Sequence, residues 1–278
     1  MSIGSETHAP GDLQQIGVVT RYELHKHIRS RRIIGILAIE ALVIVLILLI
    51  PPLTGNAYGK DPATFVSTFT GFTSLLAIVG AILFAGDAIV SEFQGRTGYL
   101  ILPNPVKRRS FFFGKVLASM IIMLMIMTIY YVAAILAGLA ITGGFTELSV
   151  YSYLLALLYG AAAISVGYLI SAIMKGATAA LVLTFAVLLL ILPVITQVGT
   201  VAGAKPSWSL SFCGETITDV MQTPYPQDFV TPGHTPIQNL TKYHFFPDIA
   251  ESVVVMLVYV GIGLGVALFV FNRKELLG

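Results

Sequence analysis

Charged side chains are scarce in this chain of 278 residues. Asp, Glu, Lys and Arg together make up 11% of it, whereas soluble domains carry about 25%. Hydrophobic residues make up 56%, which leaves too few polar side chains to cover the surface of a soluble domain. The composition therefore excludes a soluble fold and predicts an integral membrane protein. The net charge of +2 is too small to indicate nucleic-acid binding.

Residues that carry chemistry are also few. The single cysteine, Cys213, excludes an internal disulfide and a cysteine-rich metal site. The chain has no His-Glu-x-x-His pattern and no glycine-rich phosphate loop ending in Lys-Ser or Lys-Thr. All five histidines lie outside the long apolar runs, at His8, His25, His27, His234 and His244. We therefore expect no catalytic residues, no metal ligands and no cofactor site in this chain.

Long apolar runs dominate what remains. A helix needs roughly 20 apolar residues to cross a hydrocarbon core of about 30 Å. Six runs satisfy this requirement, at about residues 33–53, 62–88, 111–141, 151–174, 177–198 and 249–271. The sequence thus predicts an all-α polytopic fold whose membrane domain covers residues 33–278.

The distribution of basic residues predicts the orientation, because cytoplasmic loops are enriched in Lys and Arg. With six spans both termini lie on one side, and most basic residues fall on that side: Arg21, Lys26, Arg29, Arg31, Arg32, Arg96, Lys107, Arg108, Arg109, Lys115, Lys175, Arg273 and Lys274. Only Lys60, Lys205 and Lys242 fall on the other. We expect a multi-pass protein of the plasma membrane with cytoplasmic termini.

Two segments outside the spans have features of their own. Residues 1–15 are polar and lack the apolar core of a signal peptide, so we expect a disordered tail. Residues 16–32 predict a helix on the cytoplasmic membrane surface. Within it, Thr20-x-x-Glu23 has the spacing of a capping box, which predicts a helix start at Arg21.

The segment 199–248 predicts an extracellular cap. It is rich in proline and aromatic residues, and residues 209–221 predict a short helix at the outer membrane face. Loops of this length are usually functional or disordered. Asn239 begins an Asn-x-Thr sequon.

Glu40 is the clear ionisable residue within a span. It lies roughly 12 Å along the helix from Arg32, at 1.5 Å per residue. A carboxylate at that depth is protonated, hydrogen-bonded or exposed to a wet cavity. The sequence leaves open a role in a substrate path, a structural bond to another span, or a position nearer the interface. Such scarcity of buried charge disfavours a secondary transporter.

A spaced motif connects the second and third runs. It consists of Gly86-Asp87-Ala88-Ile89-Val90-Ser91-Glu92, then Thr97, then Pro105-Val106-Lys107-Arg108-Arg109, and finally Gly114-Lys115. This segment resembles the ABC-2 family of transport permeases, the membrane subunits of ATP-driven exporters. In that family a glutamate precedes a Gly-Thr pair, and a Pro-Val-x-Arg-Arg turn leads to Gly-Lys. One departure is that Arg96 stands where the family usually has the glycine.

The resemblance implies a cytoplasmic coupling helix between the second and third spans that docks into an ABC ATPase. The residues implied in this coupling are Asp87, Ser91, Glu92, Phe93, Arg96 and Thr97, together with Arg21 and Glu23 of the N-terminal helix. A local alternative is a salt bridge between Glu92 and Arg96, which are spaced i, i+4. The resemblance also implies two ATPase subunits, which bind ATP and magnesium, and a second permease copy or homologue. Membrane lipids would surround the spans.

The sequence leaves the substrate open among drugs, peptides, lipids or lipid-linked glycans, and sodium. The largely apolar spans favour an amphipathic or lipid-like substrate. The alternative from another class is a stand-alone membrane scaffold or sensor with the segment 199–248 as a ligand-binding cap.

Overall fold

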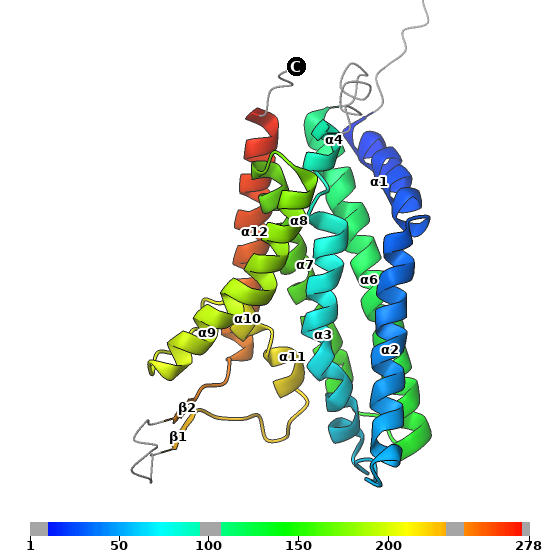
Figure 1. Ribbon diagram of the computed structural model, residues 1–278, viewed down its shortest axis with the longest axis vertical. Coiled ribbons are helices and arrows are strands. Elements are labelled where there is room, and N and C mark those ends of the chain that lie inside the picture. Colours follow the sequence, from blue (N-terminus) through cyan, green and yellow to red (C-terminus); the bar gives the residue numbers. More distant parts are fainter. Residues whose placement is uncertain (1–10, 95–106, 232–241, 274–278) are drawn as a thin grey trace, which may run out of the picture.

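The computed structural model describes residues 11–94, 107–231 and 242–273 (Figure 1). The helices and strands follow one another as α1 (Asp12–Ile28), α2 (Arg31–Leu53), α3 (Pro62–Ala85), α4 (Val90–Gln94), α6 (Arg108–Thr142), α7 (Leu148–Ile173), α8 (Ala177–Phe185), the π-helix η1 (Ala186–Ile191), α9 (Leu192–Val201), α10 (Leu210–Cys213), α11 (Thr216–Asp219), β1 (Phe229–Thr231), β2 (Lys242–His244) and α12 (Ile249–Arg273).

Within these described residues, six helices are long and apolar enough to cross a membrane. The second of them runs from α3 into α4, and the fifth is the continuous succession of α8, η1 and α9. The prediction of an all-α polytopic membrane protein is confirmed. The third span begins at Arg108, three residues before the expected start, because the helix extends beyond its apolar part.

Helix α7 forms the centre of the bundle. Its most apolar window is 72% buried, against 17% for those of α2, α8–α9 and α12. It contacts α3, α6, α8 and α12, and Tyr159 and Tyr168 on it are fully buried. The outer helices expose many large apolar side chains, as expected for surfaces that contact lipid.

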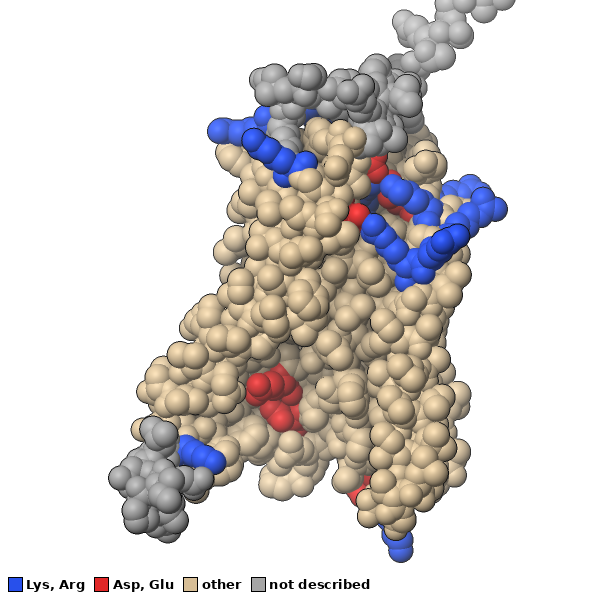
Figure 2. Space-filling model, in the orientation of Figure 1, with Lys and Arg blue, Asp and Glu red and all other residues tan. Residues whose placement is uncertain are grey.

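Basic residues gather at one end of the bundle, which we call the α1 end. It holds α1, α4, the start of α6 and the end of α12 (Figure 1). Figure 2 shows most Lys and Arg side chains there and few at the opposite end. The opposite end carries α10, α11 and the antiparallel strands β1 and β2, in which Phe229 pairs with His244. The single helix expected over 209–221 is divided into α10 and α11 around Gly214 and Glu215.

The N-terminal helix begins at Asp12, so the predicted start at Arg21 is wrong, and residues 12–15 are helical rather than part of a disordered tail. Thr20 lies in mid-helix instead of at a cap: its hydroxyl is 2.8 Å from the Ile16 carbonyl oxygen and 3.2 Å from that of Gly114 on α6. The capping-box spacing failed because Thr20 and Glu23 face α6 and are buried there.

Helix α1 packs closely on α6 at Gly114. A Cβ atom at that position would lie 2.6 Å from Val19 Cγ1 and 3.2 Å from the Ile16 carbonyl oxygen. We therefore expect Gly114→Ala to push α1 away and to destabilise the protein by about 1–3 kcal/mol, a typical cost of overpacking. Thermal unfolding in mild detergent measures this effect. Gly35→Ala is the control, since nothing lies within 4 Å of its Cβ position; equal midpoints for the two variants would refute the close contact.

Candidate functional site

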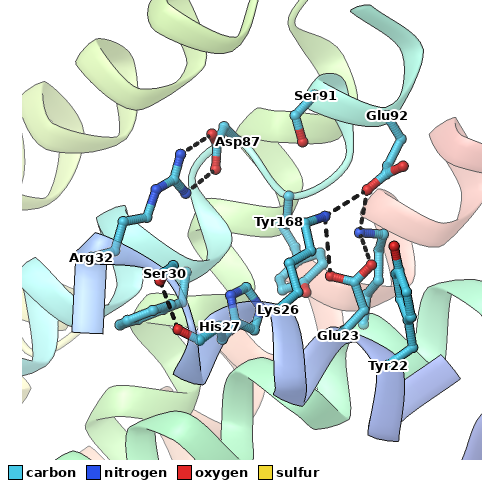
Figure 3. A pocket seen from close by; sticks show the side chains of 13 residues that line it. Tyr22, Glu23, Lys26, His27, Ser30, Arg32, Asp87, Ser91, Glu92 and Tyr168 are labelled. Carbon is cyan, nitrogen blue, oxygen red and sulfur yellow. Dashed lines mark hydrogen bonds and ion pairs between the residues drawn. The ribbon is translucent and has the colours of Figure 1, made fainter. Parts of the chain in front are cut away.

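A cavity of about 570 Å³ lies at the α1 end, in the region where the motif residues meet the N-terminal helix (Figure 3). Its walls come from α1, α2, α3, α4, α6 and α7 and from the turn that joins α3 to α4. The lining residues are Tyr22, Glu23, Lys26, His27, Ser30, Arg32, Phe84, Asp87, Ala88, Ser91, Glu92, Lys115 and Tyr168.

Lys115 is the centre of an ion-pair cluster beside this cavity. Its Nζ lies 2.7 Å from Glu23 Oε1 and 2.8 Å from Glu92 Oε1. The side chains of Lys115 and Glu23 are each 4% exposed and that of Glu92 is 10% exposed. The cluster joins α1, α4 and α6 through charges that are almost removed from water. Each charge in such a setting depends on its partners, because an unpaired buried charge is costly.

Lys26 completes the cluster from its exposed side. Its Nζ lies 3.0 Å from Glu92 Oε1 and 3.4 Å from Glu23 Oε2. Partial burial lowers the pKa of Lys26, but the carboxylates of Glu23 and Glu92 outweigh burial and hold the pKa above its ordinary value. The four side chains thus carry two positive and two negative charges, which balance.

His27 stands next to this cluster and is neutral at pH 7. Burial lowers the pKa of His27 to about 4, and the cations Lys115, Lys26 and Arg32 lower it further against the opposing effect of Glu23. Its ring contacts Phe84 of α3 edge-on, with ring centroids 5.2 Å apart. His27 therefore serves as an uncharged packing group between α1 and α3.

A second ion pair holds the end of α3. Arg32 of α2 donates from both terminal nitrogens to Asp87, at 2.8 Å to Oδ1 and 2.6 Å to Oδ2. The same guanidinium donates to the Leu83 carbonyl oxygen at 2.6 Å. Figure 3 shows this bidentate pair of Arg32 and Asp87 on the opposite side of the cavity from the Lys115 cluster. Bidentate geometry fixes orientation as well as distance, so Asp87 ties α2 to the turn before α4.

Helix α4 is short, and contacts with neighbouring helices hold it from its start to its end. At its start, the amide groups of Ile89 and Val90 donate to Ser171 Oγ of α7 at 2.9 and 3.1 Å. Phe93 contacts Phe271 of α12, with ring centroids 6.0 Å apart. Gln94 Oε1 accepts a hydrogen bond from the Ala177 amide at the start of α8, at 2.9 Å.

With the Lys115 cluster included, α4 is connected to α1, α6, α7, α8 and α12. A displacement of α4 would therefore act on five helices at once. Such an arrangement suits a segment that transmits movement from one helix to several others. Within the described residues, no group of three or more His, Cys, Asp or Glu side chains is placed to hold a metal ion.

The structure brings together four of the residues implied in coupling: Asp87, Ser91 and Glu92 with Glu23, all of which line the cavity. Phe93 lies nearby against α12, and Arg21 is exposed on α1. Arg96 and Thr97 lie outside the described residues, and so does any bond between Glu92 and Arg96.

Sequence reasoning missed the partners of these residues, namely Lys115 for Glu92 and Glu23, Lys26 for both carboxylates, and Arg32 for Asp87. The Gly114-Lys115 step of the motif was the available signal for the first of them. It marked Lys115 as part of a pattern, but it could not identify the carboxylates that Lys115 contacts.

Glu40 lies apart from this site. It is 1% exposed, and neither carboxylate oxygen has a hydrogen-bond partner within the described residues. It is not one of the residues that line the cavity at the α1 end. A structural bond to another span, one of the alternatives that the sequence leaves open, is therefore not seen in the described part of the chain, and a role in a substrate path stays a prediction.

Comparison with known proteins agrees with the resemblance of the motif. Residues 18–276 match the family described as ABC-2 family transporter protein. A comparison with curated proteins found no match. The family match includes the N-terminal helix from residue 18 onward, the motif, all six long helices and the segment before the last of them. The chain therefore belongs to the ABC-2 transporter family, whose members are non-catalytic membrane permeases of ABC-type transporters and work with an ABC ATPase.

Proposed function

We propose that this chain is the permease subunit of an ATP-driven exporter. Two permeases, either two copies of this chain or this chain and a homologue, form the substrate pathway between them. Two separate ATPase subunits bind ATP and magnesium and dock at the α1 end. Coupling passes from the ATPase through the segment that contains α4 to the spans.

The connection of α4 to five helices is the observation that carries this proposal. Each of three consecutive residues of α4 contacts different neighbouring helices. Glu92 pairs with side chains of α6 and α1. Phe93 contacts α12, and Gln94 contacts the start of α8. A docked partner that moves α4 by even a small amount would strain all of these contacts. Packed interfaces respond to strain by switching between discrete arrangements rather than by deforming continuously, which suits alternating access.

The basic residues at the α1 end support the proposed orientation. Because cytoplasmic loops are enriched in Lys and Arg, the α1 end faces the cytoplasm and the end with α10 and α11 faces outward. ATP is available only on the cytoplasmic side, so this orientation places α4 where an ATPase can reach it. The membrane concerned is the plasma membrane.

The exposed face of α1 supplies docking contacts beside α4. Arg21 is exposed there, and Tyr22 is 66% exposed while also lining the cavity. The buried side chains of α1 are Gln15, Thr20 and Glu23. Since the inner face holds the polar network, the outer face with its basic and aromatic side chains is available to a partner.

Charge reversal on this face tests the proposal. We expect Arg21→Glu to reduce co-purification of the ATPase by at least tenfold while the permease stays folded, because Arg21 is exposed and contributes no bond to the cluster. Lys60→Glu is the matched control: the same charge change at an exposed residue of the opposite end. Equal ATPase recovery with Arg21→Glu and Lys60→Glu would contradict docking at α1.

A further inference from the structure

A second cavity, of about 440 Å³, lies at the end of the bundle opposite to α1. Its walls come from α3, α7, η1, α9 and the α10–α11 segment. Two acidic residues, Glu215 and Asp219, line it. Figure 2 shows a red acidic patch in a hollow at this level, surrounded by surface without charged side chains. The motif that identified the family lies at the other end, so this cavity is separate from the site described above.

Asp219 is buried in this cavity without a full set of partners. The residue is 8% exposed. Its Oδ2 atom is buried and has no hydrogen-bond partner within the described residues. Its Oδ1 accepts a long hydrogen bond from Gln222 Nε2, at 3.4 Å. A carboxylate oxygen held in this way lacks a positive or hydrogen-donating neighbour, and a native protein rarely leaves such an atom unsatisfied unless something else occupies its surroundings.

Glu215 adds a second carboxyl group one helical turn from Asp219. Glu215 is itself an exposed residue. Partial loss of water around its carboxyl group, together with the nearby Asp219, raises its pKa to about 7. Burial raises the pKa of Asp219 to about 6. Among the residues that line the cavity there is no Lys, Arg or His. In the described part of the chain, the other titratable groups around the pair are Tyr159 of α7, Cys213 of α10, and Tyr225 and Asp248 after α11.

The remaining walls combine apolar surface with hydroxyl groups. Leu75, Ile78, Leu189 and Pro193 supply apolar surface, and Ser74 and Thr218 are among the hydroxyl residues. Leu189 belongs to the π-helix η1, a type of segment found frequently at functional sites. Cavities of about 300–1,000 Å³ accommodate small organic molecules, so this volume exceeds what a bare ion needs.

We propose that this cavity is a substrate site for amphipathic organic cations, whose positive group is held by Asp219 and Glu215 and whose apolar body contacts the walls. This inference rests on the proposed transport function and adds the chemical class of the substrate. A bare metal ion fits less well, because a calcium ion takes 6–8 oxygen ligands and the site presents two carboxylates. An organic cation needs only charge and apolar contact, and the cavity supplies both.

Ethidium is a suitable probe, since it is an aromatic organic cation whose fluorescence rises when it leaves water. We expect the purified full-length chain in mild detergent to bind ethidium, and Asp219→Asn to weaken binding by at least tenfold. Glu215→Gln should weaken it in the same direction. Glu251→Gln is the control, an exposed carboxylate of α12 that does not line the cavity. Asp219→Asn removes a buried unpaired charge, so its thermal midpoint should be unchanged or higher, which separates lost binding from unfolding.

Acidification supplies an independent readout. Both carboxylates have raised pKa values, so lowering the pH from 8 to 5 protonates them and removes the negative charge that holds the cation. We expect ethidium binding to weaken at least tenfold over that range in the unaltered protein and to change little in Asp219→Asn/Glu215→Gln. Binding by Asp219→Asn equal to that of the unaltered chain would overturn the proposal, as would displacement of ethidium by micromolar calcium, which would indicate a metal site instead.

The binding assay does not involve the ATPase, so the two proposals can fail separately. Absence of ethidium binding with the ATPase still co-purifying would overturn the cavity proposal and leave the permease function intact. Ethidium binding that depends on Asp219, in a chain that never recovers an ATPase, would support the cavity and contradict the proposed exporter.

Discussion

Replacing Lys115 with methionine is expected to destabilise the protein by about 3–5 kcal/mol, the usual cost of removing one partner from a buried ion pair. Lys115 is the shared partner of Glu23 and Glu92, and its side chain is only 4% exposed. Methionine keeps much of the side-chain length but leaves two carboxylates with Lys26 alone, on the exposed side. The expected result is a strongly lowered thermal unfolding midpoint in mild detergent and early release of α1 from α6.

The same α1–α6 junction contains a matched control. Lys107 pairs with Asp12 at 2.7 Å, but the two side chains are 66% and 57% exposed. An exposed pair contributes about 0–1 kcal/mol, so Lys107→Met should hardly change the midpoint. If Lys115→Met and Lys107→Met had equal unfolding midpoints, burial of the Lys115 cluster would not be the source of its contribution to stability.

Charge reversal of Glu92 is expected to abolish ATP-driven transport, with at least a tenfold loss of rate. Lysine at this position would stand beside Lys115 and Lys26, which lie 2.8 and 3.0 Å from the present carboxylate. Repulsion should push α4 away from α1 and α6, so ATPase movement would no longer reach the bundle. Transport into inverted vesicles measures the rate, and resistance to carbonate extraction measures membrane insertion, which we expect to persist.

Glu147→Lys is the corresponding control, because Glu147 is an exposed carboxylate at the opposite end of the bundle. Its reversal should leave transport unchanged. The neutral variant Glu92→Gln should give an intermediate rate, since it removes the attraction without adding repulsion. Normal ATP-driven transport by Glu92→Lys would contradict the role of this cluster in coupling.

Apolar run lengths predicted the six long helices well, because length and hydrophobicity alone decide whether a segment can cross a membrane. The N-terminal helix shows where such local reasoning stops. Thr20 and Glu23 have the spacing of a cap, yet the same spacing occurs in mid-helix when both residues face a neighbour. Packing on Gly114 of α6, over 90 residues away in the sequence, decides the outcome.

The candidate site was predictable in some of its members but not in its bonds. The motif residues Asp87, Ser91 and Glu92 were identified from their spacing, and the structure places them in one cavity. Their partners come from remote positions, as in the pair of Asp87 and Arg32. Contacts over such separations depend on how helices pack, which no local pattern contains.

The acidic cavity shows the same limit. Glu215 and Asp219 lie in a segment that the sequence predicts as a short helix, and acids one turn apart are ordinary on a solvated helix. Their significance comes from the cavity that both line against α3 and α7, in which Asp219 is buried. Burial cannot be read from a segment whose neighbours are unknown.

The central claim is that this permease works with a separate ATPase docked at the α1 end. Affinity purification of the chain from its native host in mild detergent, with mass spectrometry of the co-eluting proteins, tests it most directly. The account predicts a stoichiometric ATPase with a phosphate-loop motif, retained by Lys60→Glu and lost with Arg21→Glu. Recovery of the chain alone, reproducibly across detergents and after crosslinking, would contradict the account and favour a stand-alone scaffold or sensor.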